Sequence, residues 1–152
     1  MGEGGPTDPT YDPAAVSHRA LREIRRELER HPAVAHAQGF PPDSHARVEG
    51  RLDPSPFGVD VDSATLTVRW FAGETPDDPP EFSIHYSDER GVDFGWHHEP
   101  NPHVEGWGHY QERTDSTAEY AYEPHSFSTS VPSRVIWETL SLLQDAVSTV
   151  DH

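Results

Sequence analysis

Hydrophobic and polar residues alternate along three segments in the middle of the chain, and this period of two is typical of half-buried β-strands. The apolar positions are Leu66, Val68, Trp70, Phe82, Ile84, Tyr86, Val92, Phe94 and Trp96. A breaker-rich run from Gly73 to Pro80 separates the first segment from the second, and a turn over residues 87–91 separates the second from the third. The last two segments therefore predict a hairpin with one apolar face.

The other face of this hairpin carries polar side chains, namely Glu81, His85, Asp93 and His97. A five-residue loop would pair Tyr86 with Val92. This register predicts that His85 lies opposite Asp93 and that Glu81 lies opposite His97.

Two segments have helical periodicity. Asp12 followed by Pro13 is typical of a helix start, and apolar residues then recur every four positions until His31 and Pro32 end the helix. The inward positions of this first helix are Val16, Ala20, Ile24 and Leu28. A closing helix is predicted from about Pro132 to Thr149, with Trp137 at the edge of its apolar stripe. Its inward positions are Ile136, Leu140, Leu143 and Val147.

The remaining segments complete a single predicted domain over residues 12–152. Residues 33–63 have a loop-like composition with a short strand at 47–52, and two further short strands are expected near 107–112 and 119–123. Residues 1–11 are rich in Gly and Pro and are predicted to be a disordered lead. The expected fold class is α+β, an antiparallel β-meander of four to five strands between an N-terminal and a C-terminal amphipathic helix.

The composition indicates a habitat. The 152 residues include 27 Asp and Glu against 11 basic residues, for a net charge of -16, and every basic residue is Arg. Such an acidic chain without Lys is typical of a salt-rich cytoplasm, where repulsion between carboxylates is screened over about 3 Å at 1 M salt. The charge therefore predicts a halophilic protein, and it says less about the partner that this protein binds.

Other features of the composition exclude classes of function. No segment approaches the 18 or so apolar residues of a membrane span, and the first residues do not form a signal peptide, so we expect a cytoplasmic protein without a membrane partner. The chain contains no Cys, which excludes disulfides, thiol catalysis and Cys-ligated zinc.

Histidines and carboxylates gather just after the predicted hairpin. Pro100 and Pro102 break regular structure there, so the cluster is expected on a rigid loop anchored to the sheet. The candidate catalytic residues are His97, Glu99, His103 and His109.

Three interpretations of this cluster remain open. Imidazole and carboxylate are ligands for a borderline metal, although the spacing of His97, His103 and His109 matches no compact ligand motif. Alternatively, two His, or one His with Glu99 or Glu105, would serve as general acid and base on one substrate oxygen. In the third interpretation the histidines are polar surface, with His98 and His125 capping an aromatic core.

The order of elements, together with the segment Glu99-Pro100-Asn101-Pro102-His103 and a later His109, resembles the TumE-type toxin family of prokaryotic toxin–antitoxin pairs. The resemblance covers residues 45 to 148. This chain departs from the family pattern because Val104 replaces the second His of the first group, and the downstream His and Lys positions hold Tyr110, Gln111 and Glu112.

The resemblance implies a small intracellular effector that acts on RNA or nucleotides and is silenced by a helix-turn-helix antitoxin protein. The sequence leaves a second hypothesis from another class. In it the chain is a non-catalytic, acidic partner-binding protein of a halophile. Neither the cofactor nor the presence of a metal follows from the residues.

Overall fold

The computed structural model describes residues 10–57 and 60–150, and within them the chain forms an α+β fold with one antiparallel sheet. The seven strands follow one another in the order β1-β2-β3-β4-β5-β6-β7, a meander without crossovers. They span Val34–Phe40 (β1), Arg47–Leu52 (β2), Ala64–Phe71 (β3), Glu81–Asp88 (β4), Asp93–His98 (β5), Gly108–Arg113 (β6) and Ala121–Pro124 (β7). Helix α1 spans Pro13–Arg30, helix α2 spans Pro132–Val150, and a short 3-10 turn, η1, spans Ser55–Phe57.

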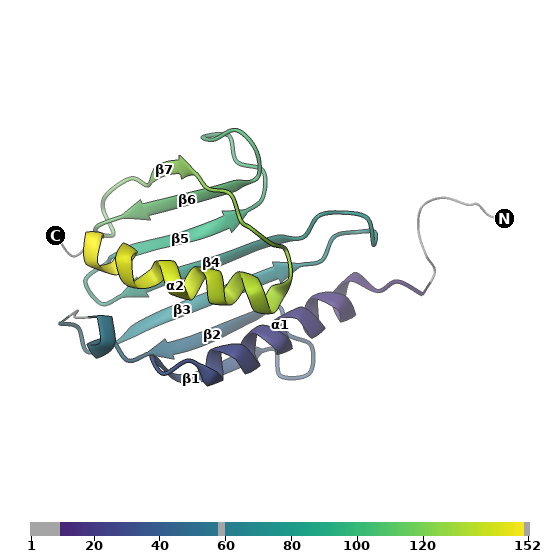
Figure 1. Cartoon of the computed structure of the whole chain (residues 1–152), viewed down its shortest axis with the longest axis horizontal. Helices are drawn as coiled ribbons and strands as arrows, with labels where there is room; N and C mark the ends of the chain where they lie inside the picture. The colour runs from purple at the N-terminus through teal and green to yellow at the C-terminus, as the bar shows by residue number, and fades with distance from the viewer. Residues whose placement is uncertain (1–9, 58–59, 151–152) are drawn as a thin grey trace.

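Both helices lie on the same face of the sheet, as Figure 1 shows. The alternating apolar residues of the strands point toward them and are buried, which confirms the predicted inward face of the hairpin. We call the opposite side of the sheet, which neither α1 nor α2 covers, the open face.

Helix α1 begins and ends where the sequence predicts. The side chain of Asp12 accepts hydrogen bonds from the backbone N–H groups of Ala14 and Ala15, and His31 caps the other end. The buried face is rotated slightly from the prediction, because Ser17 and Leu21 are buried and Val16 is only half-buried. In α2 the predicted inward residues are buried, and Trp137 is 39% exposed at the edge of the stripe.

The described part of the chain has seven strands, more than the four to five predicted. One of the additional strands is β1, which lies in residues 33–63, where the sequence predicts a loop. This edge strand, with the sequence VAHAQGF, carries only Ala37 and Gly39 as buried residues, so large apolar side chains do not mark its inward face. Ala and Gly have low strand propensity, and the sequence therefore gives little strand signal. Strands β2, β6 and β7 lie close to their predicted positions.

The register of the β4–β5 hairpin also differs from the prediction. Tyr86 pairs with Phe94 rather than with Val92, and His85 pairs with Gly95 rather than with Asp93. The turn is displaced by one residue because the carboxylate of Asp88 accepts hydrogen bonds from the backbone and the side chain of Arg90.

The structure describes only the end of the predicted N-terminal lead. Residues 1–9 of the predicted lead lie outside the described residues, whereas Tyr11 donates a hydrogen bond to the carbonyl of Gly73. Across residues 10–57 and 60–150, neither helix is long and apolar enough to cross a lipid bilayer.

Candidate active site

A row of side chains crosses the open face from one strand to the next. The register of the sheet pairs Phe40 with Arg47, Arg47 with Arg69, Arg69 with Ser83, Ser83 with His97, and His97 with His109. These positions alternate with buried core residues, so their side chains project away from the helices. We call Phe40, Arg47, Arg69, Ser83, His97 and His109 the cross-strand row.

His85 joins this row from the neighbouring position on β4. Its Nε2 atom lies 2.5 Å from the Nε2 atom of His97, and the two rings meet edge to face. The direct cross-strand partner of His85 is Gly95, whose missing side chain leaves room for the imidazole to lie over the backbone. His85 and His97 are called the histidine pair below.

A carboxylate holds the outer nitrogen of each ring. Nδ1 of His85 lies 2.6 Å from Oδ1 of Asp93, and Nδ1 of His97 lies 2.6 Å from Oε1 of Glu99. A carboxylate in this position fixes the orientation of an imidazole and the tautomer it adopts. Asp93, His85, His97 and Glu99 thus form one continuous chain of hydrogen bonds.

The number of protons in this chain follows from its geometry. Each of its three contacts needs one proton between two acceptor atoms, and ionised carboxylates supply none. The two imidazoles must therefore carry three N–H groups between them. When every contact is made, one ring is neutral and the other is an imidazolium ion.

Burial distinguishes the two rings. The side chain of His97 is only 13% exposed, and burial together with the charge of a protonated His85 lowers the pKa of His97 to about 4, although the hydrogen bond to Glu99 acts in the opposite direction. In the three-proton state His97 is therefore the neutral ring and His85 the imidazolium.

Asp93 is well placed to balance that charge. Burial alone would raise its pKa, but hydrogen bonds from His85 and Tyr120 outweigh burial and hold the pKa of Asp93 below its usual value. A guanidinium nitrogen of Arg113 lies 3.7 Å from the second oxygen of Asp93. The carboxylate beside His85 is therefore ionised at neutral pH.

The structure brings only part of the predicted set together. His97 and Glu99 form a hydrogen-bonded pair, and the ring of His109 stacks on His97 with 4.8 Å between ring centroids. His109 is fully buried, and its Nε2 lies 3.3 Å from the side-chain nitrogen of Asn101. It contacts the histidine pair as a packed neighbour and has no hydrogen bond to it among the described residues.

His103 lies apart from the histidine pair. Its ring stacks on Tyr122 with 4.3 Å between centroids, and its backbone N–H donates to the side chain of Asn101. The loop that carries His103 connects β5 to β6 and is irregular, as Pro100 and Pro102 predict.

The structure does not form the metal centre that was one interpretation of the cluster. Within residues 10–57 and 60–150, no group of three or more His, Cys, Asp or Glu side chains is arranged to hold a metal ion. His109 stacks nearly parallel to His97, at 15°, and His103 stacks on Tyr122, so the imidazoles of these residues are held as packed rings.

The capping interpretation fits two other histidines. His98 lies against Phe82, Trp107 and Phe127, and its Nδ1 lies 2.7 Å from the carbonyl of Pro80. His125 contacts Phe127 edge to face. These two rings cover aromatic residues on the helix side of the sheet and take no part in the histidine pair.

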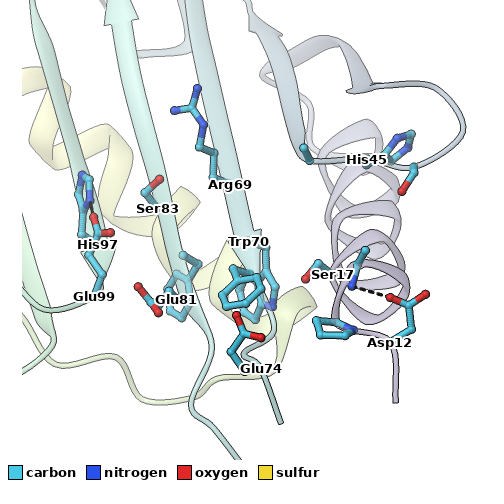
Figure 2. A pocket seen from close by; sticks show the side chains of 16 residues that line it. Asp12, Ser17, His45, Arg69, Trp70, Glu74, Glu81, Ser83, His97 and Glu99 are labelled. Carbon is cyan, nitrogen blue, oxygen red and sulfur yellow. Dashed lines mark hydrogen bonds and ion pairs between the residues drawn. The ribbon is translucent and has the colours of Figure 1, made fainter. Parts of the chain in front are cut away.

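A groove of about 820 Å³ opens beside His97. Figure 2 shows Arg69, Ser83 and His97 side by side on neighbouring strands, with the carboxylates of Glu74, Glu81 and Glu99 below them. The first turn of α1 and His45 close the far end. The size of the groove suits a ligand as large as a nucleotide or a short chain segment.

Sequence reasoning missed His85 and Asp93 as members of the site. The alternation of the hairpin places both on the same face as His97, and this signal is sufficient to include them. The candidate set was instead taken from residues close together in sequence, and the partners of His97 come from another strand and from the start of β5.

Comparison with protein-family models, with curated proteins and with solved structures gives no match for this chain. What the site does is therefore inferred from its own geometry.

Proposed function

We propose that this chain is a small toxin-like effector that uses the histidine pair for general acid–base catalysis. The observation that carries the proposal is the chain of contacts Asp93–His85–His97–Glu99, with separations of 2.6, 2.5 and 2.6 Å. Its three-proton state combines a neutral imidazole, which can accept a proton, with an imidazolium ion, which can give one.

The roles follow from burial and charge. The neutral His97 is the general base, since its Nε2 atom carries no proton in the three-proton state and the residue lines the groove where a substrate would lie. His85, with ionised Asp93 behind it, is the general acid. Asp93 and Glu99 are positioning residues, because each holds the Nδ1 atom of its imidazole.

A substrate oxygen reaches either Nε2 atom only if the direct contact between the rings opens. The side chains of His85 and His97 are 22% and 13% exposed, so the pair is accessible from the open face although it is largely enclosed. A hydroxyl group that enters between the rings would replace one short hydrogen bond by two ordinary ones.

The biological setting comes from the TumE-type resemblance. It supports an effector that acts on RNA or nucleotides inside the cell and is kept silent by a helix-turn-helix antitoxin protein. The groove beside a proton-transferring pair is consistent with such an enzyme.

The test is induced expression with and without a neighbouring helix-turn-helix gene, scored as growth arrest. We expect arrest without the neighbour and rescue with it. His97→Ala and His85→Ala should abolish arrest, and Glu99→Gln should weaken it. His36→Ala is the matched control, because His36 is an exposed imidazole on the same face at the sheet edge.

Thermal melting in high salt must accompany each variant. Variants of His85 and His97 that melt normally and still arrest growth would end the catalytic proposal. An isolated gene and a chain that never arrests growth would favour the alternative, a non-catalytic partner-binding protein.

A further inference from the structure

The cross-strand row contains a pair of like charges. Arg47 on β2 and Arg69 on β3 are direct cross-strand partners, and both side chains project from the open face. Side chains in this relationship are only about 5 Å apart at their Cβ atoms, and like charges placed so destabilise a sheet. Folding alone therefore does not explain why two guanidinium groups occupy these positions.

The two guanidinium groups are not equally neutralised. Nε of Arg47 donates a hydrogen bond of 2.7 Å to Glu49, and its guanidinium lies over the ring of Phe40. Arg69 is exposed and has no hydrogen bond or ion pair among the described residues. The pair thus presents at least one free, forked donor set toward solvent, which matches the geometry of a phosphate.

The open face differs in charge from the rest of this acidic protein. Its strand positions carry Arg47, Arg51, Arg69 and Arg113 against Glu49, Glu81 and Asp93. The chain as a whole has a net charge of -16. A surface that is close to neutral, and positive when the histidine pair holds its extra proton, therefore repels an anion less than the net charge of the whole chain suggests.

We propose that the open face binds single-stranded RNA along the cross-strand row, with one phosphate between Arg47 and Arg69 and an adjacent ribose at the histidine pair. This inference rests on the proposed function and names its substrate class. Arg69 and His97 are two strands apart, or about 10 Å at the usual strand spacing, so one extended chain can span both.

Aromatic rings extend the same surface at both ends. Phe40 begins the row at β1, and Phe71, at the end of β3, is 39% exposed. Tyr122 lies beyond β6 under the ring of His103. Exposed rings on an open antiparallel sheet are platforms on which unpaired bases stack. Phe71 is such a ring, whereas Arg47 already covers one side of Phe40 and His103 covers one side of Tyr122. The carboxylates of Glu74 and Glu81 lie below Arg69 and Ser83 in the groove (Figure 2), where they repel phosphate and favour its approach from the Arg69 side.

RNA is favoured over DNA because an acid–base pair needs a hydroxyl group next to the phosphodiester, and the 2′-hydroxyl is that group. Neutral His97 takes its proton, the 2′-oxygen bonds to phosphorus, and the bond from phosphorus to the 5′-oxygen breaks. Protonated His85 gives its proton to the leaving oxygen. The products are a 2′,3′-cyclic phosphate and a 5′-hydroxyl, and the pair keeps one extra proton throughout.

The test is fluorescence anisotropy with a labelled RNA of about eight nucleotides, at the lowest salt at which circular dichroism shows a folded chain. Arg47→Gln and Arg69→Gln should each weaken binding about tenfold. Each should also reduce the slope of log affinity against log salt by about 0.7. Arg19→Gln, which removes the same charge from the outer side of α1, should leave affinity and slope unchanged.

Three competitors test whether the surface recognises an RNA strand or any phosphate group. They are DNA of the same sequence, a nucleoside monophosphate and inorganic phosphate. We expect RNA to bind the wild-type chain at least as tightly as DNA, and both small anions to compete only at much higher concentration. Equal losses in all three Arg variants, or tighter binding of the monophosphate than of the oligomer, would overturn the inference.

His97→Ala separates this inference from the proposed function. It should weaken RNA binding less than Arg69→Gln does, because it removes no phosphate contact, and it should lose cleavage to the cyclic phosphate. Binding without cleavage by the wild-type chain would sink the catalytic proposal and leave the RNA surface standing, whereas absence of RNA binding by the folded wild-type chain would sink the RNA surface.

Discussion

The imidazole of His85 lies directly over the backbone of Gly95, its cross-strand partner in the hairpin. A Cβ atom added at Gly95 would meet the backbone carbonyl oxygen of Ile84 most closely, and it would lie 2.7 Å from Cδ2 and 2.8 Å from Cγ of that ring, closer than real side chains approach. Gly95 is therefore required for close approach, and it permits His85 to reach Asp93 on one side and His97 on the other.

Gly95→Ala should break the histidine pair without removing either imidazole. The methyl group pushes His85 away from the sheet and also crowds the backbone carbonyl of Ile84, and we expect a loss of at least about 1–3 kcal/mol in the free energy of unfolding from overpacking. NMR of the imidazole side chains would show whether the downfield proton between the rings disappears. Gly106→Ala is the control, because it adds a methyl group at a glycine away from the site where nothing lies within 4 Å. The positive φ of Gly106 adds backbone strain to the cost of that substitution. An unchanged imidazole spectrum in Gly95→Ala would contradict the arrangement described for His85.

The free energy of unfolding should fall as pH decreases from 6.5 toward 4, in part because of His97. Its pKa is about 4 in the folded chain and near 6.5 when unfolded, so in this window the unfolded state binds more protons. The contribution of His97 is at most about 1.4 kcal/mol per pH unit. Urea titrations at several pH values would measure it.

The matched variant for this pH dependence is His97→Gln. Burial also lowers the pKa of His18, His31 and His125, so the wild-type slope has several contributors of the same sign. The difference in slope between the wild-type chain and His97→Gln isolates the contribution of His97. Identical slopes in the two proteins would show that His97 titrates normally.

The two faces of the hairpin should respond differently to truncation. Phe94 is fully buried and stacks on Tyr86, so Phe94→Ala should cost about 3–5 kcal/mol in the free energy of unfolding. Ser87, on the open face of β4, is exposed, and Ser87→Ala should change the free energy of unfolding by less than about 0.5 kcal/mol. Denaturant midpoints would decide, and similar losses at both positions would mean that the assigned faces are wrong.

Folding should depend on salt. With a net charge of -16 and no Lys, self-repulsion in dilute buffer should cost several kcal/mol, comparable with the whole stability of a domain. We expect the melting temperature to be much higher in about 2 M KCl than in about 0.05 M KCl. Circular dichroism would measure both melting temperatures. Equal values in the two solutions would refute the halophilic interpretation.

The sequence by itself determined which residues of the hairpin and of α2 face the core. A period of two assigns the faces of the hairpin whatever its register, because a shift of two residues leaves every side chain on the same side. Asp12 and Pro13 likewise fixed the start of α1 through local hydrogen bonds. His97 and Glu99 were candidates because histidines and carboxylates gather just after the hairpin, and their spacing of two residues places both on one face of the sheet.

Only the tertiary structure decided which side chains meet. The register of β4 and β5 depends on the Asp88–Arg90 turn, and a shift of two residues exchanged Asp93 for Gly95 opposite His85. Strand β1 is stabilised by pairing with β2 and by cover from α1, and its own side chains give little signal. The cross-strand row from Phe40 to His109 joins residues far apart in the sequence, and such contacts arise only when the sheet is assembled.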